Sequence, residues 1–452
     1  MKRLDRREWV RLALAGSGGI TLAALASGLP RDFLETGRVA HAQEGPEPTF
    51  FVFAFSPQGD PLNANCPGSY PNPSDESDIA RNVEHPTTAE LGRQPLGTID
   101  GQPYFAADLE SGTACRIGGD ETWAARPWAD LPAALRNRMS IIRHRTLTNA
   151  HAEMNSVLDF HSAIKGPGRV GVETFPSLIA QETHSRLGTV LEGPVSLAGS
   201  FSYRGVPVRR QTPDTLEGLF AGAGRWAGFS DSDFALARDA VLDAVYRDSR
   251  MSGTPAQRRF IDNHARSRRD ARDLSSTLGA SLAPIGSSDN NNEKRAIAVA
   301  ALFKHRVTPV VAIRLPFGGD NHADSNLETE ALETIQGVDG IHRLWQELTV
   351  QGLEDQVTFA ILNCFGRTLN RTGGGGRSHH GNDHVMVTFG PRVEPGLVGS
   401  LVADDRGRLE AGPIADIPMD ESLASVGKTV AKACGVPDEV IDERIVGGRV
   451  IA

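Results

Sequence analysis

Two patterns of hydrophobic and polar positions alternate along the chain. Continuous apolar runs of strand length predict strands buried on both faces, and they occur at Thr49–Ser56, Met139–His144, Pro194–Leu197, Thr308–Leu315, Val357–Leu362 and His384–Phe389. Between them, a 3.6-residue apolar period predicts helices at Ala150–Ile164, Phe175–His184, Ser232–Arg250, Pro255–Leu278, Glu293–His305, Ser325–Val350 and Ser422–Cys434. This alternation predicts an α/β fold with a mainly parallel sheet sandwiched between helices.

One region departs from this alternation. Gln58–Leu131 is rich in Pro, Gly, Asn and Asp and has no strong period, so we interpret it as an irregular insertion within one α/β domain that spans residues 43–452. A loop of this length in a compact domain usually has a function. At the start of the predicted helix Ser325–Val350, Ser325 followed by Glu328 has the spacing of a helix N-cap, which predicts that this helix begins at Ser325.

The first 42 residues are typical of an export signal. Arg6-Arg7 lies in a basic segment that precedes an apolar stretch from Leu12 to Leu29, and Ala40-His41-Ala42 has the small-x-small pattern of a cleavage site. The paired arginines predict twin-arginine export to the periplasm or the extracellular space, with membrane contact only during export. A single membrane anchor is the alternative, because the apolar run is about long enough for a thin span.

Charge and cysteine content narrow the classes of partner. The chain of 452 residues has 47 Lys and Arg against 56 Asp and Glu. Residues 1–42 hold seven basic and four acidic side chains, so the mature chain keeps 40 against 52 and has a net charge of −12. Nucleic acid is therefore not an expected partner. Cys66 and Cys115 are candidates for a disulfide, with free thiols as the alternative.

Candidate metal ligands follow the predicted strands. Asp60 comes a few residues after the first strand, and Asp320 and His322 follow Thr308–Leu315, just before a predicted helix. The carboxyl ends of parallel strands share one edge of a sheet, where ligands usually bind. Because carboxylates and imidazoles together suit zinc or manganese, Asp320 and His322 could share one ion.

The strongest chemical pattern is His379, His380, Asp383 and His384, three histidines and an aspartate within six residues. The chain has 13 histidines in total, so this clustering favours metal binding over a solvated loop. The glycine run Gly373–Gly376 precedes it and indicates either a backbone nest for an oxyanion or a flexible loop.

Taken in order, these motifs resemble an uncharacterised family of exported bacterial proteins within the alkaline phosphatase and sulfatase superfamily. The resemblance rests on Gly59-Asp60-Pro61-Leu62-Asn63, on Asp320-x-His322, on Phe365-Gly366-Arg367-Thr368 and on His379-His380-Gly381. It covers nearly the whole mature chain and adds His151, in Asn149-Ala150-His151, as a catalytic candidate. It implies an alkaline phosphatase-like fold with one or two metals at the strand ends and activity on phosphate or sulfate esters.

The departures from the family pattern bear on the ion and on activity. Cys364 replaces a glutamate, and His379 replaces an aspartate. Fewer carboxylates shift the preference from Mg²⁺ or Ca²⁺ toward zinc, or remove metal binding. We therefore expect a divalent metal, zinc before others, held by Asp60, Asp320, His322, His379, His380, Asp383 and His384.

Two functions follow from this site. One is a metal-dependent hydrolase of a small anionic ester, in which Arg367 steadies the anion. The alternative is a noncatalytic relative that binds a surface partner or polysaccharide.

Overall fold

The computed structural model describes residues 46–59, 62–166, 173–220, 231–255, 257–258, 262, 274–317, 319–373 and 375–451. The predicted signal 1–42 and the predicted ligand Asp60 lie outside these residues. The described residues form two compact units, one within 212–307 and the other made of 46–211 and 308–451. The sequence did not indicate this grouping, because the helices of the smaller unit have the same period as those of the larger one.

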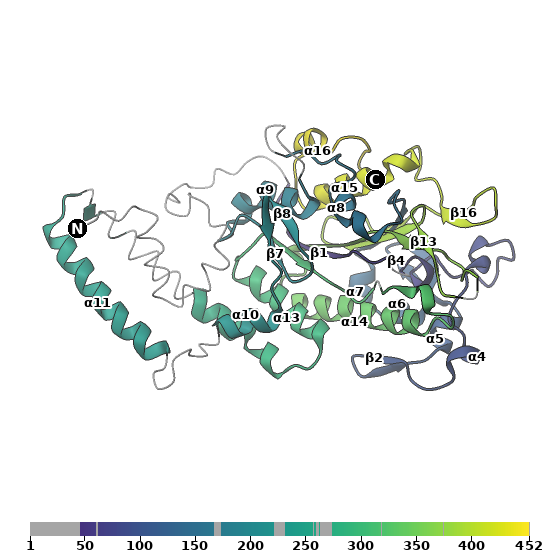
Figure 1. Ribbon diagram of the computed structural model, residues 1–452, viewed down its shortest axis with the longest axis horizontal. Coiled ribbons are helices and arrows are strands. Elements are labelled where there is room, and N and C mark those ends of the chain that lie inside the picture. The colour runs from purple at the N-terminus through teal and green to yellow at the C-terminus, as the bar shows by residue number, and fades with distance from the viewer. Residues whose placement is uncertain are drawn as a thin grey trace. The chain divides into compact units, whose positions relative to one another are not determined.

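The larger unit contains a seven-stranded sheet with the strand order β15-β6-β14-β11-β1-β10-β7 (Figure 1). Every neighbouring pair of these strands is parallel except the two pairs that β14 makes with β11 and β6. The sheet is therefore mostly parallel, and the predicted α/β class is confirmed. In that order the strands are Gly396–Val398, Met139–His144, His384–Phe389, Val357–Asn363, Phe50–Ser56, Val310–Ile313 and Val195–Ser196.

The central strand β1 shows why these runs form strands. All seven of its residues are buried, as expected of a strand covered on both faces. Phe51 and Phe53 point to one face, where their rings meet Phe175 at 5.7 and 5.8 Å between centroids. Seven residues of β1 pair in register with β11.

Helices cover both faces of this sheet (Figure 1). On one face lie α8, α9, α15 and α16, whose apolar side chains join the core around Phe51 and Phe53. On the other face lies α14, whose Trp345 contacts Phe389 of β14. These helices span Met154–Leu158, Phe175–Leu187, Ser422–Ala433, Asp438–Arg444 and, for α14, Glu328–Val350.

The segment predicted as an irregular insertion consists of short elements. It contains α3 Leu62–Asn65, η3 Ile79–Asn82, α4 Thr88–Leu91, β2 Gly97–Ile99, β3 Gln102–Tyr104, α5 Ala107–Glu110, β4 Thr113–Ile117, β5 Asp120–Ala124 and α6 Arg126–Ala129. Arg371 ties this segment to the site loops through ion pairs with Glu84 and Glu90. Cys66 and Cys115 are free and buried, so the candidate disulfide is not formed.

The remaining short elements of the larger unit lie in its loops. They are α7 Ala133–Arg136, η4 His151–Glu153, β8 Phe201–Tyr203, β9 Val206–Val208, η7 Asn321–Ala323, β12 Gly366–Arg367, β13 His379–His380, β16 Leu401–Ala403, β17 Leu409–Ala411 and η8 Met419–Glu421.

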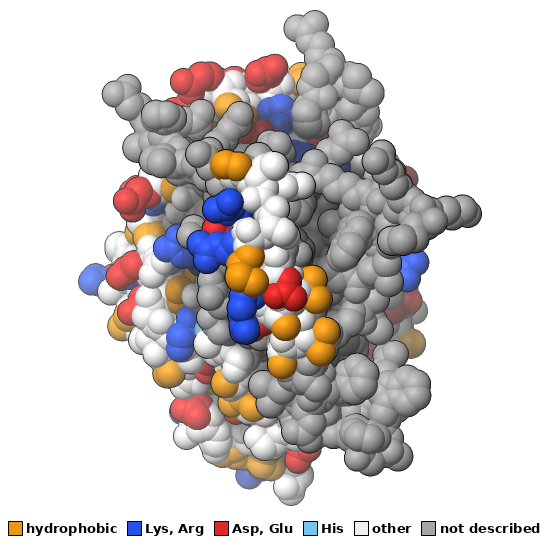
Figure 2. Space-filling model, turned by 90° about the vertical axis from the view of Figure 1, so that its left-hand side faces the viewer, with side chains coloured by type: hydrophobic (Ala, Val, Ile, Leu, Met, Phe, Trp, Pro, Cys, Tyr) orange, Lys and Arg blue, Asp and Glu red, His pale blue; other side chains and the backbone are white. Residues whose placement is uncertain are grey.

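The smaller unit is helical, with α10 Pro213–Phe220, α11 Asp231–Ser252, η6 Ala283–Ser287 and α13 Asn291–Lys304. A further helical stretch runs over 274–282, and most of the predicted helix Pro255–Leu278 lies outside the described residues. Helix α11 exposes Val241, Val245 and Met251. On the face drawn in Figure 2, hydrophobic side chains are interspersed with basic and acidic ones.

The predicted start of one helix and the predicted end of another were wrong. The long helix α14 begins at Glu328, and the carboxylate of Asp324 caps it by accepting hydrogen bonds from the backbone N–H groups of Thr329 and Glu330. Ser325 is not the cap, because Leu327 turns the chain with a φ of 58° just before the helix. The helix predicted over Ala150–Ile164 ends at Leu158.

None of the helices in the described part of the chain is long and apolar enough to cross a membrane.

Candidate metal site

The loops at the carboxyl edge of the sheet carry the candidate residues. Strands β1, β10, β11 and β6 end at this edge, and the antiparallel β14 begins there, as its pairing of His384 with His144 shows. The loops that follow β6 and β10, and β13 ahead of β14, therefore meet at one edge.

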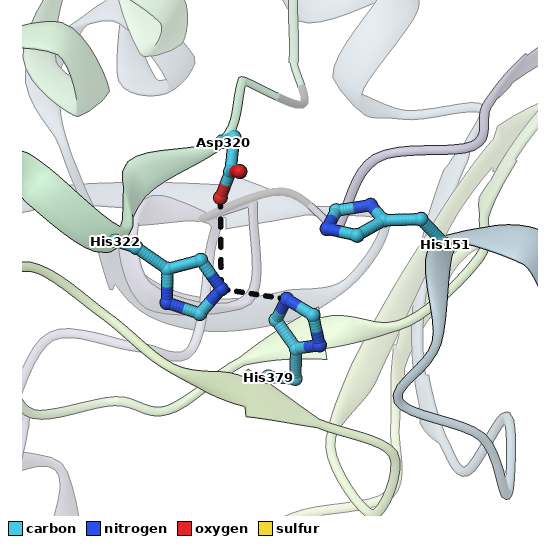
Figure 3. Close-up of side chains that lie close together, drawn as sticks. All are labelled: His151, Asp320, His322 and His379. Atoms are coloured by element: carbon cyan, nitrogen blue, oxygen red, sulfur yellow. Dashed lines mark hydrogen bonds and ion pairs between the residues drawn. The ribbon is translucent and has the colours of Figure 1, made fainter.

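Four side chains from these loops converge, namely His151, Asp320, His322 and His379. Each side chain offers one potential ligand atom, and these four atoms all lie within 4.8 Å of one another. Within the described residues, these four side chains form the group that could hold a metal ion. Figure 3 shows the three rings and the carboxylate facing a common centre. The side chains of Asp320 and His322 are 54% and 46% exposed, so the centre is open to solvent.

Backbone carbonyls orient two of these imidazoles. The Nδ1 of His151 lies 3.1 Å from the carbonyl oxygen of Pro57, and the Nδ1 of His379 bonds to the carbonyl oxygen of Asn149. A carbonyl only accepts, so each Nδ1 carries a proton, and in the neutral ring the lone pair is then on Nε2. The Nε2 atoms point to the centre (Figure 3), which is the orientation that metal-ligating histidines usually have.

The third imidazole adds another acceptor. The Nε2 of His322 lies 2.7 Å from the Nε2 of His379 and 3.6 Å from Oδ1 of Asp320. Without an ion, Nε2 of His322 either accepts from Arg367 Nη1 at 3.3 Å or donates to Nε2 of His379, and a metal ion would take the place of that contact. Ligands of a tetrahedral zinc ion are about 3.3 Å apart, so shifts of about 1 Å would let these side chains hold one.

Arg367 lies behind this group, and its side chain is 0% exposed. An arginine has five N–H groups, and each has a partner here. The acceptors are the Gly59 carbonyl at 3.1 Å, His322 Nε2 at 3.3 Å, the Arg377 carbonyl at 3.5 Å, the Gly319 carbonyl at 3.2 Å and Asp320 Oδ1 at 3.3 Å. In this arrangement each N–H of Arg367 has a protein partner, and the role of Arg367 in steadying a substrate anion stays a prediction.

The charges of the site depend on Arg367. Partial burial acts to raise the pKa of Asp320, but Arg367 and then His322 outweigh it and lower that pKa, so Asp320 is a carboxylate at neutral pH. Burial lowers the pKa of His379, and Arg367 and the neighbouring imidazoles add to this effect against the hydrogen bond to Asn149. His379 is therefore held in its neutral form, the form that binds metals.

The glycine run has a packing role that the sequence did not reveal. The backbone N–H of Gly376 donates to the carbonyl oxygen of His322 at 2.8 Å. A Cβ at Gly376 would overlap the carbonyl oxygen of Asn321, and one at Gly375 would lie 2.7 Å from that of His322. These two glycines are therefore required because the ligand loop passes against them, and they are neither an anion nest nor a free loop.

His384 does not join the group, contrary to the prediction. Its Nε2 accepts from the backbone N–H of Asn363 at 3.2 Å, and its Nδ1 lies 3.0 Å from Nε2 of His144. The Nδ1 of His144 in turn lies 3.4 Å from the carbonyl oxygen of Arg145. This chain of bonds uses all four ring nitrogens of two buried imidazoles and leaves no lone pair for a metal.

Asp383 and His380 also lie apart from the four converging side chains. Asp383 is fully buried, with its carboxylate 3.2 Å from both Arg143 Nη1 and Asn63 Nδ2. Its ion pair with Arg143 replaces the predicted metal contact. His380 follows His379 in β13, so its side chain points to the opposite face of that strand. Burial lowers the pKa of His380, and the carboxylate of Asp383 is the largest influence that acts in the opposite direction.

Three contributors were not found from the sequence. The carbonyls of Pro57 and Asn149 carry no side-chain signal. Cys364 donates from Sγ to the carbonyl oxygen of Ala150 at 3.2 Å and so anchors the residue before His151. Burial raises the pKa of Cys364 to about 12, so it is a thiol and not a metal-binding thiolate.

No protein-family model matches this chain, and no curated protein matches it. The resemblance to the alkaline phosphatase and sulfatase superfamily therefore stays a prediction, and the functional argument depends on the site itself.

Proposed function

We propose that the protein binds a divalent metal ion, with zinc preferred, through His151, Asp320, His322 and His379, and uses it to hydrolyse a small anionic ester. The observation that carries this proposal is the convergence of acceptor atoms. Two Nε2 lone pairs fixed by backbone carbonyls, a third imidazole nitrogen and a carboxylate meet within 4.8 Å. A cation satisfies such a set, and imidazole nitrogens favour zinc over Mg²⁺.

The choice of an anionic ester follows from the charges. Asp320 is paired with Arg367 at 3.3 Å, so the ligand set is close to neutral and a bound divalent ion keeps its positive charge. Such an ion attracts a phosphate or sulfate group, polarises its oxygen and lowers the pKa of a bound water that can attack it. In this proposal His151 is a ligand and not an acid or base.

The proposed place of action is the periplasm or the extracellular space, reached by twin-arginine export. This part rests on Arg6-Arg7 and the cleavage pattern of Ala40-His41-Ala42 in the sequence.

Calorimetric titration of the mature chain with zinc, after purification without a nickel column, tests the metal site. We expect one ion per chain, and His379→Ala should weaken binding at least about a hundredfold because it removes a fixed lone pair. His342→Ala, on α14 and outside the group, is the control and should bind zinc as the unchanged protein does. The absence of zinc binding by the unchanged protein at neutral pH would refute the proposal.

Turnover is tested separately on zinc-loaded protein, with p-nitrophenyl phosphate and p-nitrophenyl sulfate as probes. Release of nitrophenol that disappears in His379→Ala supports the hydrolase. Zinc binding without turnover of either probe would favour the noncatalytic function in which the loaded site binds a surface polysaccharide or other partner.

A further inference from the structure

Glu333 of α14 contacts the loop that carries Asp320 and His322. A Cβ built on Gly319 would overlap Oε1 of Glu333, so this carboxylate lies against the Gly319 backbone, where the Gly319 N–H and the Asn321 side chain are the donors that act on it. Since the carbonyl of Gly319 accepts from Arg367 at 3.2 Å, the two polar groups of this glycine face side chains from two different segments. We propose that Glu333 is a positioning residue, which sets the direction of the chain into Asp320 and so presents the proposed metal ligands.

The contact needs a glycine at position 319. A Cβ built there would overlap Oε1 of Glu333 and would lie 3.1 Å from its Oε2. The carboxylate thus occupies the space that a side chain at residue 319 would take. Close approach of the Glu333 carboxylate therefore explains the glycine at this position.

The environment of Glu333 supports a specific role for this carboxyl. Burial raises the pKa of Glu333 to about 7, while the hydrogen bond from Gly319 acts in the opposite direction. A half-buried carboxyl without a partner cation is costly unless hydrogen bonds compensate. It lies on a helix of 23 residues, and a rigid element is a suitable support for a metal-ligand loop.

Three backbone groups of the ligand loop are therefore contacted from three different segments. Arg367 holds the Gly319 carbonyl, Glu333 holds the Gly319 N–H, and Gly376 donates to the His322 carbonyl at 2.8 Å. Of these contacts, the one from Glu333 can be removed without touching a proposed ligand or the buried guanidinium.

The first test is hydrogen exchange at the amides of Gly319, Asn321 and His322 in metal-free protein. Glu333→Ala should speed exchange at these amides at least about tenfold, because the Gly319 N–H loses its acceptor. Glu333→Gln keeps an oxygen acceptor and should restore protection. Glu347→Ala is the matched control, because Glu347 lies on the same helix and its carboxylate accepts from Nε2 of Gln351, and it should leave these amides unchanged.

Gly319→Ala sharpens the test, because its methyl group should displace the Glu333 carboxylate and give the same fast exchange. The double variant Gly319→Ala, Glu333→Ala should then be no worse than either single variant. Additive effects would overturn the proposal, and so would unchanged protection in Glu333→Ala or a Glu333→Gln variant that behaves like Glu333→Ala.

The second test rests on the proposed metal site and uses zinc. Glu333→Ala should weaken zinc binding about tenfold, the usual effect of losing a partner that orients a ligand, while Glu333→Gln stays within about threefold of the unchanged protein. If the unchanged protein binds no zinc, the metal proposal fails, yet the exchange results still decide the positioning role. Equal zinc affinity in Glu333→Ala and the unchanged protein would refute the role of Glu333 in presenting the ligands.

Discussion

In two places within the described residues, two imidazoles meet nitrogen to nitrogen, and the two pairs differ in what surrounds them. His322 and His379 meet at 2.7 Å between Nε2 atoms in an open site, whereas His144 and His384 meet at 3.0 Å in the core. In the buried pair each ring nitrogen has a partner. In the open pair, the backbone carbonyl of Asn149 fixes the outer nitrogen of His379 and leaves the inner one facing other acceptors.

This difference separates a structural histidine pair from a candidate metal site. Both pairs come from histidines near strand ends, and His379 and His384 are five residues apart in the sequence. A satisfied pair needs no cation and resists protonation. The acceptors of the open site face one another and Arg367 at an exposed position, and a cation between them would stabilise the set. Three experiments can break or sharpen this distinction, in order of decreasing expected effect.

The largest effect should come from His384→Ala. The change leaves the Asn363 N–H and the His144 Nε2 without partners in the core, and it opens a cavity, so the free energy of unfolding should fall by about 4 kcal/mol. Urea denaturation of metal-free protein measures this. His379→Ala is the counterpart and should lower stability by less than about 1 kcal/mol while abolishing zinc binding. If the two variants exchanged these behaviours, the assignment of the pairs would be reversed.

The next effect is loss of stability in acid. Burial lowers the pKa of His144 to about 4 and that of His384 well below its usual value, against about 6.5 for an unfolded histidine. Between pH 6.5 and 4 the unfolded chain binds more protons than the folded chain does. The contribution of the neutral buried pair to the free energy of unfolding is therefore complete above pH 6.5 and is lost as the pH falls toward 4. His144 alone should cost about 3 kcal/mol over this range.

Urea denaturation between pH 7.5 and 4.5 checks this sign and size. His144→Gln keeps an acceptor for His384 and should flatten the pH dependence relative to the unchanged protein. Equal slopes for the two proteins would contradict the neutral buried pair.

The smallest effect concerns the glycine run beside the open pair. Gly376→Ala should push the ligand loop away from its place, because the methyl group would overlap the carbonyl oxygen of Asn321, and zinc affinity should fall about tenfold. Gly119→Ala is the control, since a Cβ there meets no atom within 4 Å. Zinc titration of both variants decides the point, and unchanged affinity in Gly376→Ala would show that the loop tolerates the shift.

Much of the fold could be predicted from the sequence, because the strands are buried on both faces. The apolar runs Met139–His144 and His384–Phe389 match β6 and β14 residue for residue. Helix starts were less predictable. Asp324 caps α14 in place of Ser325, because the chain turns at Leu327 and no sequence pattern predicted this turn.

The candidate site was predicted in part. Asp320, His322 and His379 converge, as placement after parallel strands suggests, and His151 joins them as a neighbour whose role as a ligand we propose. His380, Asp383 and His384 were included because they are close in sequence, and the structure assigns each another environment.

The sequence by itself determined which segments form strands and that polar side chains gather at one edge of the sheet, since burial patterns and strand ends are local properties. Only the tertiary structure decided which lone pairs remain free. The Nδ1 of His384 bonds to a histidine 240 positions away, and the ring of His379 is oriented by a carbonyl 230 positions away. The guanidinium of Arg367 donates to carbonyls from three loops. A metal site depends on such hydrogen-bond partners, and partners that are distant in sequence leave no pattern along it.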